Sequence, residues 1–332
     1  MWIFGRRKIP DAILTWVLAL LLLGIPGTIS SASSGRLDRW GSQALDGEEG
    51  FDYTKLPERL AAPALRPLWE RGIEYERQRQ LLAAAEVYEE IAGRVSEESY
   101  ICWRIARNYW RHAEALPLSE KRERLRYFDL SELWAARGLA ADPDCAACML
   151  WKFVSMGRQA TTRGLLTAVA DVGEMEYLLR RGIELRPEHR DNAGNLTLGN
   201  LYYAASVFYR ILPEWRWLKW VIGVRGDLEK ASGYAKNAVE IAELRVDYRV
   251  ELGASLLCLG LSRKNPEILA QGMETLRAAR KLEDYLITDA LDKEHAGILI
   301  ESPGRACGYS RDGFIDVDRL GRQVRMGKTS GQ

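Results

Sequence analysis

The sequence predicts an all-α fold, a helical-repeat solenoid of about five helix pairs between residues 65 and 290. Three observations lead to this prediction. Apolar residues recur with a helical period, as at Leu198, Leu201, Tyr202 and Ala205, which fall on one face of a helix. A pattern of paired helices repeats along the chain, which is typical of stacked repeat proteins. No run of alternating polar and apolar residues predicts a strand in this range.

Each predicted pair combines two kinds of helix. The first has a small residue near its middle and an aromatic residue or Leu three positions later, and the second is rich in Ala or Gly. Small residues at a crossing let two helix backbones approach to about 8–10 Å while large neighbours fill the flanks. These are the positions of tetratricopeptide-type repeats. In chain order they are Gly72 and Tyr75, Ala106 and Tyr109, Cys148 and Trp151, Gly199 and Tyr202, and Gly253 and Leu256.

Several helix boundaries are marked by capping residues. Asn265 precedes Pro266, an arrangement that places a capping side chain before proline at the first helical position. Asp227 can cap a helix that begins at Leu228. The second pair closes at Asp142-Pro143, and the pair after it closes near Pro187. The repeats drift from the usual 34 residues because extra residues separate the paired helices.

Residues 1–35 have the layout of a secretory signal or a signal anchor. Arg6, Arg7 and Lys8 precede an uncharged run over residues 12–25, and small residues follow. The run is shorter than the roughly 20 residues of a membrane span, which favours cleavage after about Ala32. An uncleaved anchor is the alternative. Both place the body outside the cytoplasm, in the periplasm or anchored to the membrane.

The segments that flank the repeats have a different composition. Residues 36–64 contain Gly, Ser, Asp and Pro with few periodic apolar positions, which predicts a linker. Residues 291–332 are predicted to form an irregular C-terminal cap and tail. The predicted domains are therefore 1–35, 36–64, 65–290 and 291–332.

Composition narrows the classes of function. The net charge is +1, so no overall field favours nucleic acid. The chain has three histidines, and none stands in a metal-type pair. Phosphate-binding glycine loops and the Gly-x-Ser-x-Gly motif are missing from the sequence. We therefore expect no enzyme activity, no metal and no cofactor.

The five cysteines include one close pair, Cys145 and Cys148. The odd count leaves at least one thiol free or paired between chains in an oxidising compartment. The pair lies where a helix is predicted to begin, and a structural role is the favoured interpretation. A redox-active pair is the alternative, and it would require an accessible thiolate.

The most unusual stretch is an insertion over residues 213–226, between the two helices of the fourth pair. It combines aromatic rings with cations, which suits a surface that binds a protein partner, a small ligand or the membrane interface. The alternative is that its rings fold back as core. The candidate binding residues are Trp215, Arg216, Trp217, Lys219, Trp220 and Arg225.

The repeat residues carry a resemblance to known families. Residues 198–202 (Leu-Gly-Asn-Leu-Tyr) and 226–231 (Gly-Asp-Leu-Glu-Lys-Ala) resemble the tetratricopeptide-like periplasmic T component of TRAP transporters. Residues 103–107, the helix junction at 141–145 and Trp151 more distantly resemble the regulator-of-microtubule-dynamics family. The similarity covers about residues 68–282. The Trp-rich insertion, the Cys-containing tail and the lack of a lipid-attachment Cys depart from the first family.

The T-component resemblance implies an exported solenoid that encloses a cavity and partners the solute-binding component of a transporter. The leading hypothesis is a scaffold that holds a protein partner outside the cytoplasm. The alternative is an accessory of solute transport that encloses a small apolar ligand. The N-terminal segment is expected to contact the membrane in either case.

Overall fold

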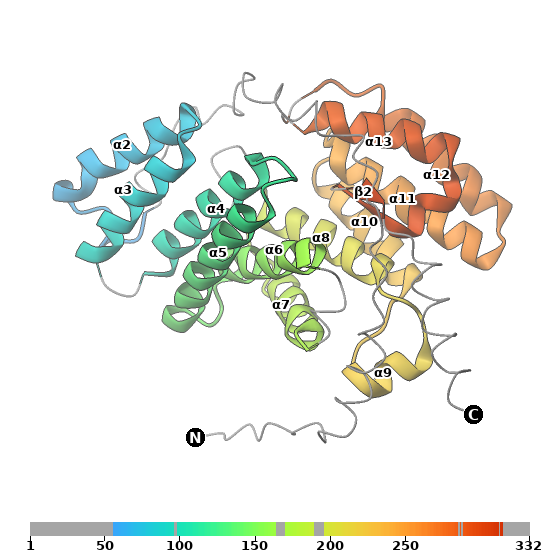
Figure 1. Ribbon diagram of the computed structural model, residues 1–332, viewed down its shortest axis with the longest axis horizontal. Coiled ribbons are helices and arrows are strands. Elements are labelled where there is room, and N and C mark those ends of the chain that lie inside the picture. Colours follow the sequence, from blue (N-terminus) through green and yellow to red (C-terminus); the bar gives the residue numbers. More distant parts are fainter. Residues whose placement is uncertain are drawn as a thin grey trace. The chain divides into compact units, whose positions relative to one another are not determined.

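The computed structural model describes residues 56–95, 98–163, 170–188, 196–284, 286, 288–311 and 313–314. Most of these residues lie in helices, so the predicted all-α class is confirmed. A short antiparallel pairing joins β1 (Tyr309–Ser310) to β2 (Gly313–Phe314). The helices, coloured along the chain in Figure 1, are α2 (Arg66–Arg77), α3 (Leu81–Arg94), α4 (Ser99–Ala115), α5 (Lys121–Ala141), α6 (Ala146–Arg163), α7 (Val172–Glu184), α8 (Thr197–Ile211), α9 (Arg216–Ile222), α10 (Leu228–Ile241), α11 (Val246–Arg263), α12 (Pro266–Ala279) and α13 (Asp289–Glu301).

The helices pack in chain order. The pairs α2 with α3, α4 with α5, α6 with α7, α8 with α10, and α11 with α12 occupy the ranges where the sequence predicts them. The second helix of each pair also contacts the first helix of the next pair. In addition, α4 contacts α6, α6 contacts α8, and α8 contacts α11, so first helices of neighbouring pairs touch directly.

Glycine at the helix crossings has the packing role that the sequence predicts. A Cβ atom at Gly72 would lie 2.5 Å from a ring carbon of Tyr88, and one at Gly253 would lie 2.5 Å from Cγ of Leu276. Such distances are shorter than any tolerated contact between carbon atoms, so both positions require glycine, which has no side chain. Tyr88 and Leu276 are buried and fill the space that glycine leaves.

The predicted helix caps are also present. The Asp227 carboxylate accepts a hydrogen bond from the backbone N–H of Lys230 at 3.0 Å. The Asn265 side chain accepts from the N–H groups of Glu267 and Ile268 at 2.9 and 3.1 Å. These bonds satisfy donors that a helix start leaves free, and each cap typically stabilises a helix by about 1 kcal/mol.

A buried ionic cluster joins the first two pairs. Glu76 of α2 accepts from Arg104, Arg107 and Asn108 of α4 at 2.6, 2.8 and 2.7 Å. All four residues are buried. Sequence patterning does not reveal this cluster, because charged residues in a helix are usually solvated.

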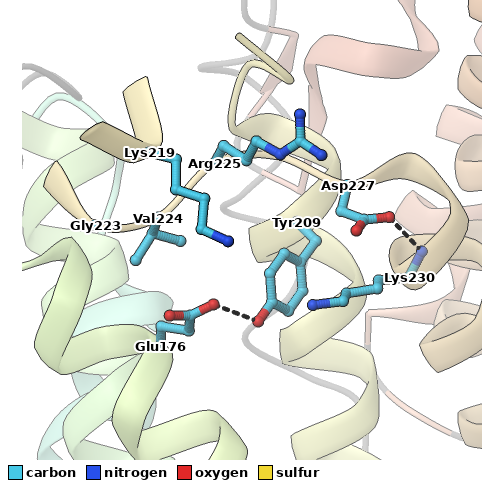
Figure 2. Close-up of a pocket in the computed structure, with 8 residues that line it drawn as sticks. All are labelled: Glu176, Tyr209, Lys219, Gly223, Val224, Arg225, Asp227 and Lys230. Carbon is cyan, nitrogen blue, oxygen red and sulfur yellow. Dashed lines mark hydrogen bonds between the residues drawn. The ribbon is translucent and has the colours of Figure 1, made fainter. Parts of the chain in front are cut away.

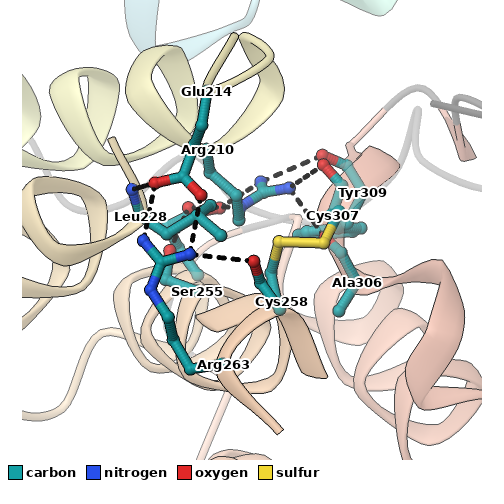
Figure 3. Close-up of a disulfide and its surroundings, with 11 residues drawn as sticks. Arg210, Glu214, Leu228, Ser255, Cys258, Arg263, Ala306, Cys307 and Tyr309 are labelled. Atoms are coloured by element: carbon teal, nitrogen blue, oxygen red, sulfur yellow. Dashed lines mark hydrogen bonds and ion pairs between the residues drawn. A yellow bond between two sulfur atoms is a disulfide. The ribbon is translucent and has the colours of Figure 1, made fainter. Parts of the chain in front are cut away.

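The C-terminal segment is attached to α8 and α11 (Figure 3). The 3₁₀-helix η5 (Pro303–Gly308) is joined to α11 by the Cys258–Cys307 disulfide. Arg210, at the end of α8, donates to Glu251 of α11 at 2.8 and 2.9 Å. The same guanidinium donates to the backbone carbonyls of Ala306, Cys307 and Tyr309. One buried cation therefore binds both a helix and an irregular segment.

Two predicted boundaries are wrong. Residues 56–64 do not all belong to a linker, because Leu56 and Leu60 are buried and Trp69 donates its indole N–H to the Leu60 carbonyl at 2.9 Å. Residues 291–301 are not irregular, because α13 covers them. The buried side of α13 combines Asp289, Asp292 and His295 with Ala296 and Leu299, so polar residues interrupt the apolar period that marks an inward helix face in the sequence.

The predictions for residues 1–35, for 36–55 and for the tail from 315 onward lie outside the described residues. Among the helices that the structure describes, none has the length and apolar character needed to cross a membrane.

Candidate functional site

All six candidate binding residues lie in the connection between α8 and α10. This connection, residues 212–227, is called the insertion loop below, and α9 forms its outer part. In Figure 1, α9 projects away from the ends of α8 and α10. The structure thus brings the candidates together on one short element of seven residues and its flanks.

Backbone hydrogen bonds close the base of the insertion loop. The N–H of Gly226 donates to the Pro213 carbonyl at 2.9 Å, and the N–H of Asp227 donates to the Tyr209 carbonyl at 3.1 Å. A Cβ atom at Gly226 would lie 1.8 Å from the carbonyl oxygen of Leu212. Only glycine fits this crossing of two chain segments, so the base depends on Gly226.

Side chains add an ionic clamp to the base. Arg263 of α11 donates to Glu214 of the loop at 2.8 and 2.9 Å, as Figure 3 shows. It also donates to Glu229 of α10 at 2.8 Å through two nitrogens. These bonds lower the pKa of Glu229. Glu214 in turn accepts from the backbone N–H of Leu228 at 3.2 Å, so a single guanidinium connects the loop with two helices.

The tryptophans of the loop differ in their exposure. Trp215 is partly buried and stacks on Trp217, with 5.5 Å between ring centroids and 18° between ring planes. Trp217 is 44% exposed and Trp220 is 91% exposed. The alternative in which these rings are core therefore does not apply to Trp217 and Trp220. Large exposed rings on a closed loop base are typical of a contact surface.

The cations beside these rings have no carboxylate partner among the described residues. Arg216 and Lys219 are exposed, and neither forms a described ion pair. Arg225 donates to the backbone carbonyl of Glu214 at 3.4 Å and forms no described ion pair with a side chain. Together with Trp220 they line a pocket of about 190 Å³. Within the part of the chain that the structure describes, this lining holds three positive charges and no acid.

A second, smaller pocket of about 100 Å³ lies on the inner side of the loop (Figure 2). Tyr209 of α8 donates its hydroxyl to Glu176 of α7 at 2.8 Å in this pocket. Burial, together with the neighbouring carboxylate, raises the pKa of Tyr209 and keeps the phenol protonated. Lys230 lies over the Tyr209 ring, 5.2 Å from its centroid. Asp227, the second acid of this pocket, accepts from the backbone N–H of Lys230, so both Glu176 and Asp227 have hydrogen-bond partners.

The structure joins Cys145 and Cys148 by a disulfide at the start of α6. Cys148 is fully buried, and Cys145 is 9% exposed. Both pack with Trp103 in a small apolar cluster. Cys102 is free and buried, and burial raises the pKa of its thiol to about 11. A buried thiol of high pKa is a poor nucleophile near neutral pH.

The two histidines that the structure describes pack against different tyrosines. His112 packs edge-on against Tyr127, and His295 packs against Tyr309. His189 lies outside the described residues. Within the described ranges, no group of three or more His, Cys, Asp and Glu residues is placed to hold a metal ion.

Sequence reasoning missed the residues that hold the insertion loop in place. Glu214 and Arg263 are 49 positions apart, and no local pattern connects them. Gly226 carried a weaker local signal, because glycine marks turns and permits a close approach of two backbones.

No family model matches this chain, and no curated protein sequence matches it.

Proposed function

We propose that this chain is a non-enzymatic, tetratricopeptide-like scaffold, exported or held at a membrane by its N-terminal segment, that binds a protein partner. The direct contacts between first helices of neighbouring pairs support a stacked array. Such arrays expose a long surface to which residues from several repeats contribute. The two disulfides fit the oxidising compartments outside the cytoplasm.

The observation that carries the proposal is a half-buried aromatic contact between two first helices. Trp110 of α4 and Trp151 of α6 lie with ring centroids 5.6 Å apart. Arg158 of α6 lies 5.9 Å from the Trp110 ring. All three are partly exposed. Tryptophan and arginine dominate the energetic centres of protein interfaces, which makes this cluster the proposed partner contact.

The experiment is native mass spectrometry of the full chain purified from its own host in mild detergent. We expect a partner protein to co-purify with the chain at fixed stoichiometry. In the Trp151→Ala variant the amount of bound partner should fall by roughly tenfold or more. The control Leu244→Ala, at a residue that is 75% exposed between α10 and α11, should retain the partner. Equal retention by both folded variants would contradict the proposed contact.

A second candidate function is a ligand-binding accessory of a solute transport system, as the T-component resemblance implies. A retained small molecule in the same spectrum would favour it. The two pockets beside the insertion loop hold about 100 and 190 Å³. Sites for small ligands usually hold roughly 300–1,000 Å³, so the geometry of these pockets supports the scaffold rather than the carrier.

A further inference from the structure

We propose that the insertion loop is a second, separate binding element, which docks on the membrane surface and binds the phosphate headgroups of anionic phospholipids. The inference goes beyond the scaffold function, but it rests on the proposed membrane tether in one respect: the tether keeps a bilayer within reach. The residues concerned are Arg216, Trp217, Lys219, Trp220 and Arg225.

Charge favours an anionic ligand. Arg216, Lys219 and Arg225 surround the 190 Å³ pocket, and no carboxylate of the described residues lines it. Nearby acids are already engaged, since Glu214 and Glu229 bind Arg263. The outer side of the loop therefore carries positive charge without an internal counter-charge. Guanidinium groups bind phosphate oxygens through paired hydrogen bonds, and an ammonium group adds a point charge.

Lys219 also borders the smaller pocket, where acids are present (Figure 2). Of these, Glu176 accepts from Tyr209, and Asp227 caps α10. No ion pair joins Lys219 to either of them among the described contacts. The ammonium group is thus available to an anion that approaches from outside.

The placement of the rings also favours a lipid surface. Trp217 and Trp220 are three positions apart on α9 and therefore neighbours on its surface. They are also the most exposed large aromatic rings on that helix, at 44% and 91%. Tryptophan prefers the boundary between headgroups and acyl chains, where its apolar ring is covered and its N–H stays hydrated.

The exposure and composition of α9 favour a lipid surface over a protein partner. A short helix with basic residues and tryptophan on its outer side is typical of elements that lie in the membrane interface. An exposed ring with few neighbours lacks the surrounding rim that shields an interface centre in protein complexes. Because the base of the loop is closed by Gly226 and Arg263, docking orders little additional chain.

The test follows backbone hydrogen exchange of residues 216–222 in the full chain, reconstituted in two bilayers. One bilayer is phosphatidylcholine, and the other contains about 30% phosphatidylglycerol. We expect exchange to slow by roughly tenfold or more in the anionic bilayer, and the effect to shrink in about 0.5 M salt. Each cation near an anionic surface contributes about fivefold in binding, so three are sufficient for this change.

Two triple variants separate local from overall charge. Arg216→Gln, Lys219→Gln and Arg225→Gln together should abolish the slowing. The control combines Lys121→Gln, Arg122→Gln and Lys264→Gln, three exposed cations outside the loop, and should leave it intact. Trp220→Ser should reduce the slowing several-fold without changing the unfolding transition, because its ring is 91% exposed.

Three results would overturn the inference. Hydrogen exchange could be equal in both bilayers, or both triple variants could lose the slowing equally. Inorganic phosphate could also slow exchange on the neutral bilayer, without any anionic lipid. The last result would assign the pocket to a free anion. Failure of the tether looks different, because the chain would then not associate with neutral vesicles. The insertion loop would still be judged by its exchange on anionic vesicles added in excess.

Discussion

The insertion loop and the C-terminal segment are two departures from the succession of paired helices, and both combine arginine with aromatic rings. In the C-terminal segment the charges are satisfied internally. Arg311 pairs with Asp292 and Asp247 at 3.2 and 3.3 Å, and Tyr309 is buried. In the loop, Arg216 and Trp220 are exposed, and Arg216 forms no ion pair with any residue that the structure describes. Arginine and aromatic side chains therefore attach the C-terminal segment to the helices, whereas those of the insertion loop are available to bind a ligand.

The difference arises from the carboxylates that the neighbouring helices provide. Helices α11 and α13 present Asp247 and Asp292 to Arg311 of the C-terminal segment. The helices around the insertion loop supply acids at its base, where Arg263 binds them, and among the described residues none of these acids lines the 190 Å³ pocket. Buried pairs hold a segment in one position, whereas exposed unpaired cations contribute little to folding.

The largest expected effect comes from Arg210→Ala. Arg210 and Glu251 are both nearly inaccessible, and the change would leave a buried carboxylate without its partner. We expect the free energy of unfolding to fall by about 3–5 kcal/mol, measured by urea denaturation of the full chain in mild detergent. Arg263→Ala is the matched control. It removes a clamp of which the guanidinium is 39% exposed, and it should cost about 1 kcal/mol.

Equal losses for the two arginines would contradict the contrast between attached and available segments. It would mean that the base of the insertion loop contributes to folding as strongly as the buried attachment of the C-terminal segment does.

The two disulfides provide the next comparison. Cys258 and Cys307 are 49 positions apart, so removing the bond with a double Ser variant should cost about 3–4 kcal/mol. Cys145 and Cys148 are three positions apart, and the same change there should cost about 2 kcal/mol or less, because a short closed loop restricts the unfolded chain little. Denaturation midpoints of the two double variants check the order, and a larger loss at Cys145 and Cys148 would reverse it.

A substitution at the base of the loop has a smaller effect. Gly226→Ala places a Cβ atom 1.8 Å from the Leu212 carbonyl oxygen, and we expect a loss of about 2–3 kcal/mol. The control is Gly233→Ala in α10, where a Cβ atom meets nothing within 4 Å. Alanine there should stabilise the helix by about 0.5–1 kcal/mol. Thermal unfolding of both variants tests the signs, and a neutral Gly226→Ala would show that the chain crossing is loose.

The smallest effect concerns pH. Burial raises the pKa of Asp292 to about 6, although Arg311 opposes the shift. The folded pKa lies above the unfolded value of about 3.9, so this group contributes stability that is complete below pH 4 and is lost as the pH rises through 6. Relative to Asp292→Asn, the wild type should therefore gain about 1–2 kcal/mol between pH 7.5 and 4.5. If the difference in the free energy of unfolding between the two proteins does not change with pH, the pKa of Asp292 is not raised.

The sequence was sufficient to predict the helix pairs because their signals are local. Gly72 and Gly253 mark crossings, and Asp227 and Asn265 mark helix starts. The exposure of Trp220 was not predictable, since the same letters fit a buried plug and a surface.

Whether the insertion forms a buried plug or an exposed surface depends on the closure of the loop base by Glu214 and Arg263. No spacing in the sequence reveals the contact between these two residues. The sequence did not predict helix α13, because the buried acids Asp289 and Asp292 occupy the first half of its inward face and only Ala296 and Leu299 are buried apolar residues.

The most direct test of the central claim compares hydrogen exchange of residues 216–222 with that of residues 303–310 in the full chain, on a neutral and on an anionic bilayer. We expect fast exchange of the first segment on the neutral bilayer and slow exchange on the anionic one. The C-terminal segment should stay slow on both. If both segments are equally protected on the neutral bilayer, or if neither responds to anionic lipid, the assignment of one segment to attachment and the other to membrane docking is wrong.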